Sequence, residues 1–269
     1  MIPATTGYVR PESVEDAVAA LADPEAKLLA GGQSLLPLMK LRVVRPALVV
    51  DIGGLDLAGV SAADGELRIG ALTTWDELAR APELERPALA GLADCARVIG
   101  DLQIRNRGTV GGSLAHADPS ADAPAALLAL GAAVELRSPA GARSLPLSDF
   151  FVGPFMTALD PTEILTEVRL SVPERGSGSA YEKVEHPASG FALVGACAVV
   201  QPGGSAVVGL TGIAASAVAI ADGDLAGALG ELDVFGDEFA PAEYRRHLAG
   251  VVASRALERA RARAAEDMR

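Results

Sequence analysis

The sequence predicts an α+β protein made of two packed units. Its 269 residues exceed the size of about 100–200 residues that is usual for one domain, and half of them are hydrophobic. Strand and helix patterns alternate in the first part of the chain, whereas the last part shows three consecutive strands and a closing helix. The run PERGSGS at 173–179 is small, polar and glycine-rich, so we place the domain boundary there.

The first unit opens with an amphipathic helix and a series of short strands. Apolar residues recur at positions 14, 18 and 21, which predicts a helix with one apolar face. Ser13 lies directly before it and can cap its start. Thr74 begins a capping box with Glu77 and predicts a second, short helix. Apolar runs bounded by glycines or turns predict strands at 27–30, 47–52 and 67–72.

The rest of this unit continues the mixture of helices and strands. We expect one helix over 84–98, despite Pro87, and an Ala- and Leu-rich helix over 123–130. The segment 133–137 is typical of a strand, and the turn Ser138-Pro139-Ala140-Gly141 predicts that the chain returns as a hairpin. Alternation over 162–172 predicts the strand that closes the unit.

The second unit contains three strand patterns joined by tight turns. They cover 181–184, 192–200 and 206–213, and their lengths suit an antiparallel meander. A helix is expected from about Pro241, with Tyr244, Leu248 and Val252 on one face.

Composition excludes several classes of function. The net charge of −12 argues against DNA or RNA as the main partner. Cys95 and Cys197 are the only cysteines and lie far apart in sequence, so they cannot supply a zinc ribbon, an iron–sulfur cluster or a disulfide framework. We expect both to be small core residues.

The longest apolar run, 206–221, falls short of the roughly 20 residues of a membrane span. The start of the chain lacks the pattern of a secretory signal, so we expect a soluble, cytoplasmic protein.

A first glycine-rich loop follows the strand predicted at 27–30. Gly31 and Gly32 can let backbone N–H groups turn toward one point, where a phosphate could approach the main chain. The spacing matches neither the GxGxxG pattern of nicotinamide-binding folds nor the P-loop pattern. A Gly-Gly pair after a strand, taken alone, is more often only a tight turn.

A second glycine-rich stretch covers 104–122 and contains three glycines within five residues, with hydroxyl groups at Thr109 and Ser113. Backbone donors in such a stretch can wrap a pyrophosphate, and Asp122 can accept hydrogen bonds from sugar hydroxyls. Asp122 could equally cap the helix that follows. Two such loops in one chain favour a two-sided anion clamp over two coincidental turns.

The two stretches together resemble a known family. LAGGQSLLPLMKLR at 29–42, followed by IGDLQIRNRGTVGGSLAHADPSADAPAALLAL at 99–130, is similar to the FAD-binding medium subunit of the molybdenum hydroxylases. That family includes enzymes of the carbon monoxide dehydrogenase, xanthine dehydrogenase and aldehyde oxidase type. The likeness continues through 149–151, 163–165, 181–183 and the closing YRRHLAGVVASRALERA, so it covers nearly the whole chain in the expected order.

This resemblance implies a two-lobed FAD-binding unit of the vanillyl-alcohol-oxidase (PCMH) type, followed by a small α+β domain with a three-stranded antiparallel sheet and helices. Lobe 1 would cover 1–56, lobe 2 would cover 57–174, and the C-terminal domain would cover 178–269. The pyrophosphate would be held by Leu28, Leu29, Ala30, Gly31, Gly32, Gln33, Ser34 and Leu35 and by Thr109, Val110, Gly111, Gly112 and Ser113. Asp122 would bind on the ribose or adenosine side, Ile99 and Leu165 would be apolar neighbours of the cofactor, and Lys183 would reach the flavin ring from the C-terminal domain.

Lys183 also attracts notice by its residue type. The chain has three lysines against twenty arginines, so a lysine is a departure from its ordinary way of supplying positive charge. A cation near flavin N1 and C2=O would stabilise the reduced, anionic flavin and raise its potential. An exposed strand lysine is the plain alternative. His186 and Gly190 stand where the family often carries Arg and Asp, and the segment between Gly212 and Pro241 is short for the family.

The implied function is electron transfer. FAD would be bound non-covalently, since only His116 of the candidate attachment residues lies in a flavin loop. The resemblance also implies two partner subunits: a small one with two [2Fe–2S] clusters and a large one with the molybdenum cofactor. The complex would be a dimer of heterotrimers and would pass its electrons to an external acceptor. A self-contained flavin oxidase or reductase of the same fold and a scaffold without FAD remain as alternatives.

Overall fold

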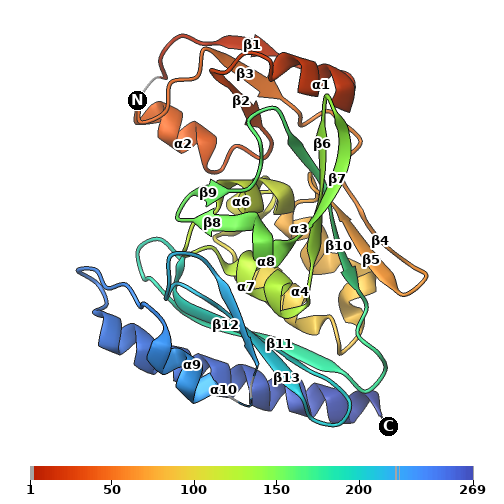
Figure 1. Ribbon diagram of the computed structural model, residues 1–269, viewed down its shortest axis with the longest axis vertical. Helices are drawn as coiled ribbons and strands as arrows, with labels where there is room; N and C mark the ends of the chain where they lie inside the picture. The colour runs from red at the N-terminus through yellow and green to blue at the C-terminus, as the bar shows by residue number, and fades with distance from the viewer. Residues whose placement is uncertain (1–2, 222, 224, 269) are drawn as a thin grey trace.

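The computed structural model describes all residues except 1–2, 222, 224 and 269. Its first layer is a small parallel sheet of strand order β1-β3-β2, with helices beside it (Figure 1). The helix at Ser13 is confirmed, because the Ser13 side chain accepts a hydrogen bond from the amide of Asp16. The elements of this layer are β1 (Gly7–Val9), α1 (Val14–Ala20), β2 (Ala26–Leu29), α2 (Leu35–Lys40) and β3 (Leu48–Asp51).

The second layer is a five-stranded sheet of order β4-β5-β10-β6-β7, in which every neighbouring pair is antiparallel. The helices of this part of the chain pack against it around one large apolar core. Its strands are β4 (Val60–Ala63), β5 (Glu66–Gly70), β6 (Ala133–Ser138), β7 (Gly141–Pro146) and β10 (Ile164–Ser171), and a separate small hairpin is formed by β8 (Phe151–Gly153) and β9 (Met156–Thr157). Its helices are α3 (Trp75–Arg80), η1 (Pro82–Glu85), α4 (Ala90–Val98), α5 (Leu102–Arg105), α6 (Val110–His116), α7 (Asp122–Ala129) and α8 (Leu147–Phe150).

Two sequence predictions in this layer need correction. The helix expected over 84–98 is divided into η1 and α4, because Pro87 cannot continue a helix and the residue before it is held extended. The second glycine-rich stretch is helical from Val110, with Thr109 as its N-cap, so it is only in part a loop. The capping box at Thr74 and the 138–141 hairpin turn are confirmed.

The third layer is an antiparallel sheet covered by the closing helix. Four strands form it, in the order β11-β12-β13-β14, and not the three that the sequence predicts. The fourth strand and α9 occupy the segment after Gly212 that is short for the family. The elements are β11 (Gly178–Glu185), β12 (Ala192–Val200), β13 (Ala206–Thr211), β14 (Val218–Ala221), α9 (Leu225–Glu231) and α10 (Ala242–Asp267).

This sheet is covered on both faces. The long helix α10 lies along one face, and α4 and α7 of the second layer lie on the other (Figure 1). Because successive side chains of a strand point to opposite faces, Ala180 packs in the core with α10 while Tyr181 packs in the core with α4. The predicted linker at 173–179 is therefore short: Gly178 and Ser179 belong to β11 and are buried.

Small residues allow the layers to approach closely. A Cβ atom on Gly209 of β13 would lie 1.9 Å from the carbonyl oxygen of Ala125 in α7, so only glycine fits. Cys95 and Cys197 are fully buried at the same seam, as expected. Burial raises the pKa of the Cys197 thiol to about 12, so both cysteines behave as small core residues. Within the described residues, no helix has the length and apolar character needed to cross a membrane.

Candidate FAD site

The first glycine-rich loop leaves β2 and turns into α2. Gly32 has φ +75°, a left-handed conformation that glycine adopts without strain. Ser34, at the start of α2, makes no side-chain capping bond. Among the described residues, no acceptor takes the amide hydrogens of Gly31, Gly32, Gln33, Ser34 and Leu35. Consecutive unpaired N–H groups of this kind suit a bound anion such as a pyrophosphate.

The second stretch lies directly against the first. A Cβ atom on Gly31 would lie 1.9 Å from the carbonyl oxygen of Arg107, and one on Gly112 would lie 3.8 Å from the Cβ atom of Ala30. The two glycine-rich segments, about 75 residues apart in sequence, are thus in direct contact. That they form the two sides of an anion clamp stays a prediction.

The structure changes which groups the second stretch can offer. The amides of Val110 and Gly111 are already used, because they donate to the carbonyl oxygens of Thr73 and Ala71 at 3.0 and 2.8 Å. The amide of Gly112 donates to the Thr109 hydroxyl oxygen at 3.2 Å. The amide of Ser113 donates to the Thr109 carbonyl oxygen at 3.1 Å. Among the described residues only the Thr109 amide of this segment has no acceptor, and the hydroxyl groups of Thr109 and Ser113 are further donors. A role of 109–113 in binding a pyrophosphate stays a prediction.

Asp122 and Lys183 form a buried ion pair at the seam between the second and third layers. The shortest distance from Lys183 Nζ to the Asp122 carboxylate is 3.2 Å, and the two side chains are 6% and 5% exposed. Lys183 Nζ also donates to the carbonyl oxygens of Val98 and Gly190, each at 2.8 Å. Its plain alternative, an exposed strand lysine, is therefore excluded.

Asp122 does not cap the helix that it begins. The N-cap position of α7 is Ala121, and it has no side-chain capping bond. The Asp122 carboxylate instead accepts a hydrogen bond of 2.6 Å from the hydroxyl of Tyr181. Burial raises the pKa of the Asp122 carboxyl, whereas the Lys183 ammonium and the Tyr181 hydroxyl act in the opposite direction.

Ile99 and Leu165 lie in different surroundings. Ile99 follows α4, is partly buried, and its carbonyl oxygen accepts a hydrogen bond of 3.2 Å from Arg105. Arg105 also donates a hydrogen bond to the carbonyl oxygen of Gly100, so it holds the backbone directly after Val98, whose carbonyl oxygen Lys183 contacts. Leu165 lies on β10 and is 5% exposed within the large core. Tyr181 is the contact that the sequence analysis missed. Its position two residues before Lys183 on one strand face could have indicated it.

The turn at 186–190 is held by local contacts. His186 Nδ1 accepts hydrogen bonds from the amides of Ala188 and Ser189, and its ring packs edge-on against Phe239 with centroids 4.4 Å apart. Lys183 anchors the end of this turn through Gly190. The turn is therefore attached to the buried ion pair through a backbone carbonyl.

Other surface features do not compete with this site. An open hollow of about 460 Å³ beside the β6–β7 hairpin shares no residue with the glycine-rich segments, and the Arg143–Glu163 ion pair lines it. No group of three or more His, Cys, Asp and Glu side chains in the described part of the chain could hold a metal ion.

Comparisons with known proteins show which family the chain belongs to. Residues 4–173 match the family described as the FAD binding domain in molybdopterin dehydrogenase. The chain is 39% identical to the carbon monoxide dehydrogenase medium chain of Afipia carboxidovorans, over 98% of this chain and 99% of the relative. It is 36% identical to the glyceraldehyde dehydrogenase medium chain of Sulfolobus acidocaldarius, over 77% and 74%.

Solved structures extend the likeness to the complete fold. A chain in the carbon monoxide dehydrogenase structure from Hydrogenophaga pseudoflava superposes with a TM-score of 0.92 and 35% identity, covering 98% of this chain and 99% of that one. A chain of quinoline 2-oxidoreductase from Pseudomonas putida 86 gives a TM-score of 0.89 with 29% identity and full coverage of both chains. The protein therefore belongs to the family of FAD-binding medium subunits of the molybdenum hydroxylases, which are oxidoreductases.

Proposed function

We propose that this protein is the electron-transfer subunit of a molybdenum-containing dehydrogenase. FAD, when bound, can accept and release electrons one or two at a time. The chain would supply the binding, the orientation and the electrostatic surroundings of the cofactor. The observation that carries the proposal is the contact between two glycine-rich segments, one of which presents five consecutive unpaired amides.

The individual residues would divide this task. The loop 28–35 would bind the pyrophosphate through its amides, and the segment 109–113 would close the other side with the hydroxyls of Thr109 and Ser113. Asp122 would bind toward the ribose or adenosine, and Lys183 would place positive charge near the flavin ring. Ile99 and Leu165 would be apolar neighbours of the cofactor. We propose that FAD is bound non-covalently, because the residues named here would hold it through hydrogen-bond donors and through close approach of the backbone.

We propose further that electrons reach the site from [2Fe–2S] clusters of a small partner subunit and leave to an external acceptor. The substrate would be oxidised at the molybdenum cofactor of a large subunit, and two heterotrimers would form the full complex. In support, relatives carry the names medium chain and FAD-binding subunit.

For the chain itself we propose three units with bounds 1–56, 57–174 and 178–269. Each contains one of the three main sheets, which supports this division. The cofactor site would then lie where the first two units meet, with Lys183 contributed by the third.

The test is to purify the chain and to titrate it with FAD while recording the flavin spectrum. A protein that binds FAD stoichiometrically, but turns over only after iron–sulfur and molybdenum subunits of its complex are added, supports the proposal. Turnover by the chain alone would favour the self-contained oxidase or reductase. A chain that cannot be loaded with FAD would favour the scaffold and would refute the proposal.

A further inference from the structure

Three polar side chains on one face of β11 connect the third layer to the second. Ser179, Tyr181 and Lys183 alternate along the strand, so they point to the same side. The Ser179 hydroxyl accepts a hydrogen bond of 2.8 Å from the amide of Gly91, at the start of α4. Lys183 reaches Val98 at the end of the same helix. Between these two contacts, Tyr181 reaches Asp122 of α7.

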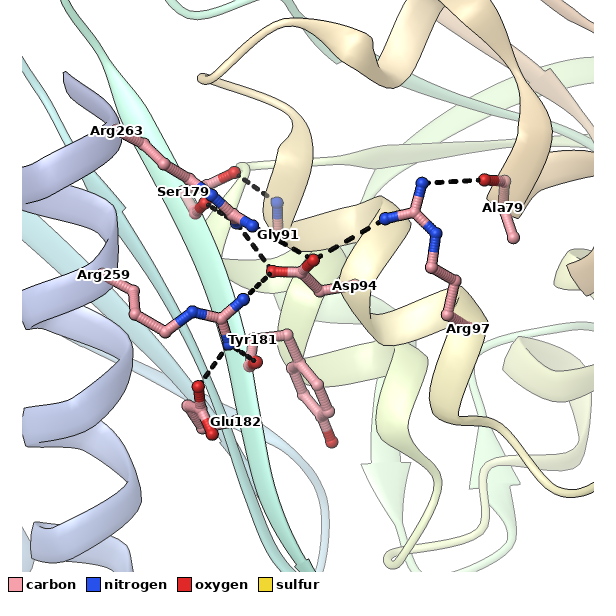
Figure 2. Close-up of polar contacts among 9 residues, drawn as sticks. All are labelled: Ala79, Gly91, Asp94, Arg97, Ser179, Tyr181, Glu182, Arg259 and Arg263. Atoms are coloured by element: carbon pink, nitrogen blue, oxygen red, sulfur yellow. Dashed lines mark hydrogen bonds and ion pairs between the residues drawn. The ribbon is translucent and has the colours of Figure 1, made fainter. Parts of the chain in front are cut away.

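Tyr181 is fixed at both ends. Its carbonyl oxygen accepts a hydrogen bond of 3.2 Å from Arg259 of α10, while its hydroxyl donates to Asp122 at 2.6 Å. Figure 2 shows its ring on the side of β11 that faces away from α10. Tyr181 is 3% exposed, so water does not compete for the hydroxyl. Space for the hydroxyl comes from Gly195, where a Cβ atom would lie 2.2 Å from it.

The strand that carries Tyr181 is itself held in place by a charged cluster. Asp94 of α4 accepts hydrogen bonds from Arg259 at 3.1 Å and from Arg263 at 2.6 Å, and Arg259 also pairs with Glu182 (Figure 2). These contacts fix β11 between α10 and α4. The position of the Tyr181 hydroxyl relative to Asp122 is therefore set by the packing of the layers.

The Tyr181 hydroxyl is one of the groups that favour the ionised form of the Asp122 carboxylate. Asp122 is buried, and burial favours its uncharged form. The Lys183 ammonium and the Tyr181 hydroxyl oppose this, together with a hydrogen bond from the backbone at Asp122. Burial also raises the pKa of Tyr181 well above its ordinary value, so its hydroxyl remains a donor. Removing the Tyr181 hydroxyl takes away one of these donors and leaves the charge of Lys183 in place.

We propose that Tyr181 is a positioning residue of the FAD site, which keeps the Asp122 carboxylate ionised and aimed so that Asp122 and Lys183 act on the cofactor as one charge-balanced pair. This inference rests on the assignment of Asp122 and Lys183 to the cofactor in the proposed function. Tyr181 does not contact the cofactor in this scheme and acts through Asp122.

The test is Tyr181→Phe in the full chain, which removes one oxygen atom and keeps the ring. The dissociation constant of FAD is measured from neutral to mildly acidic pH, together with thermal unfolding of the FAD-free protein. We expect FAD binding to weaken about tenfold at neutral pH, since a hydrogen bond to a charged group is lost. It should weaken further as the pH falls, because Asp122 becomes easier to protonate, whereas the unaltered protein stays flat over the same range.

Two comparisons make the result decisive. Tyr244→Phe makes the same chemical change at an exposed position of α10 and should leave both profiles unaltered. Asp122→Asn removes the group through which Tyr181 acts, so adding Tyr181→Phe to it should cause little further loss. Additive losses would overturn the inference, and so would a Tyr181→Phe protein that loses thermal stability but keeps a pH-independent FAD affinity. If the unaltered chain binds no FAD, the proposed function itself fails, which is a different outcome.

Discussion

Gly31 offers the sharpest test of the two-sided site, because its substitution acts on the contact between the two glycine-rich segments. A Cβ atom there would lie 1.9 Å from the Arg107 carbonyl oxygen, 2.7 Å from its carbon and 2.9 Å from the Cα atom of Gly108. All three atoms are backbone atoms, so no side chain can rotate away. Gly31 has no left-handed φ, so alanine adds the contact without adding backbone strain.

The size of the effect follows from this overlap. Ordinary contact between such atoms is about 3.5 Å, so Gly31→Ala must separate the segments by roughly 1.5 Å. Forcing an extra methyl group into a packed position costs about 1–3 kcal/mol. The FAD-free protein can relax by opening, whereas bound FAD requires both sides to close. Most of the cost should therefore appear in binding, as a roughly 10- to 100-fold rise in the dissociation constant.

The assay is a titration of the purified variant with FAD, followed by flavin fluorescence, with thermal unfolding measured in parallel. Gly250→Ala is the matched control, because this helical glycine on α10 has nothing within 4 Å of an added Cβ atom. It should keep the FAD affinity and raise stability by up to about 1 kcal/mol. A Gly31→Ala protein that binds FAD as tightly as the unaltered chain would refute a cofactor site between these segments.

Four further changes test the packing and the charges elsewhere. Asp94→Ala should destabilise the protein by about 2 kcal/mol in urea unfolding, because it leaves two α10 arginines without their shared acceptor. Arg97→Ala removes the ion pair that Arg97, a 61% exposed side chain, forms with Asp94; it should cost less than about 1 kcal/mol, and equal costs would contradict this interpretation. Gly209→Ala should lower the unfolding free energy by about 1–3 kcal/mol, and unchanged thermal unfolding would show that α7 and β13 can move apart. The hydrogen bond from Arg143 lowers the pKa of Glu163, so the stability that Glu163 contributes is present at neutral pH and is lost as the pH falls through its lowered pKa. Glu163→Gln should flatten this acid-side loss in unfolding curves, and an unaltered slope would assign it to other groups.

Local signals in the sequence were sufficient for elements whose ends carry their own capping or turn residues. Ser13, Thr74 and the 138–141 turn each form contacts within a few residues, so their roles could be predicted without tertiary context. The break at Pro87 also has a local cause, and it was missed because the apolar spacing on both sides was given more weight. The fourth strand of the last sheet has no such signal, since β14 is stabilised by pairing with β13.

The candidate site was predictable to the extent that glycine marks a close approach of backbones. Gly31 and Gly112 were identified from sequence, and each lies close to the other segment, Gly31 to Arg107 and Gly112 to Ala30. The groups used by Val110 and Gly111 could not be predicted, because their acceptors, Thr73 and Ala71, belong to a distant part of the chain. For Tyr181, the strand face that it shares with Lys183 was a usable signal, although its partner Asp122 is 59 residues away.

Two kinds of contact hold the parts of this protein together, and they should respond differently to perturbation. The glycine contact at Gly31 depends on shape alone, so salt should not weaken it. The contacts of Asp94 with the α10 arginines and of Asp122 with Lys183 depend on charge, but Asp122 is buried whereas Arg259 is partly exposed. Salt should therefore weaken the Asp94 cluster first and spare the buried pair. A protein that loses stability in salt while retaining FAD would show that the charged seam and the cofactor site are energetically separable.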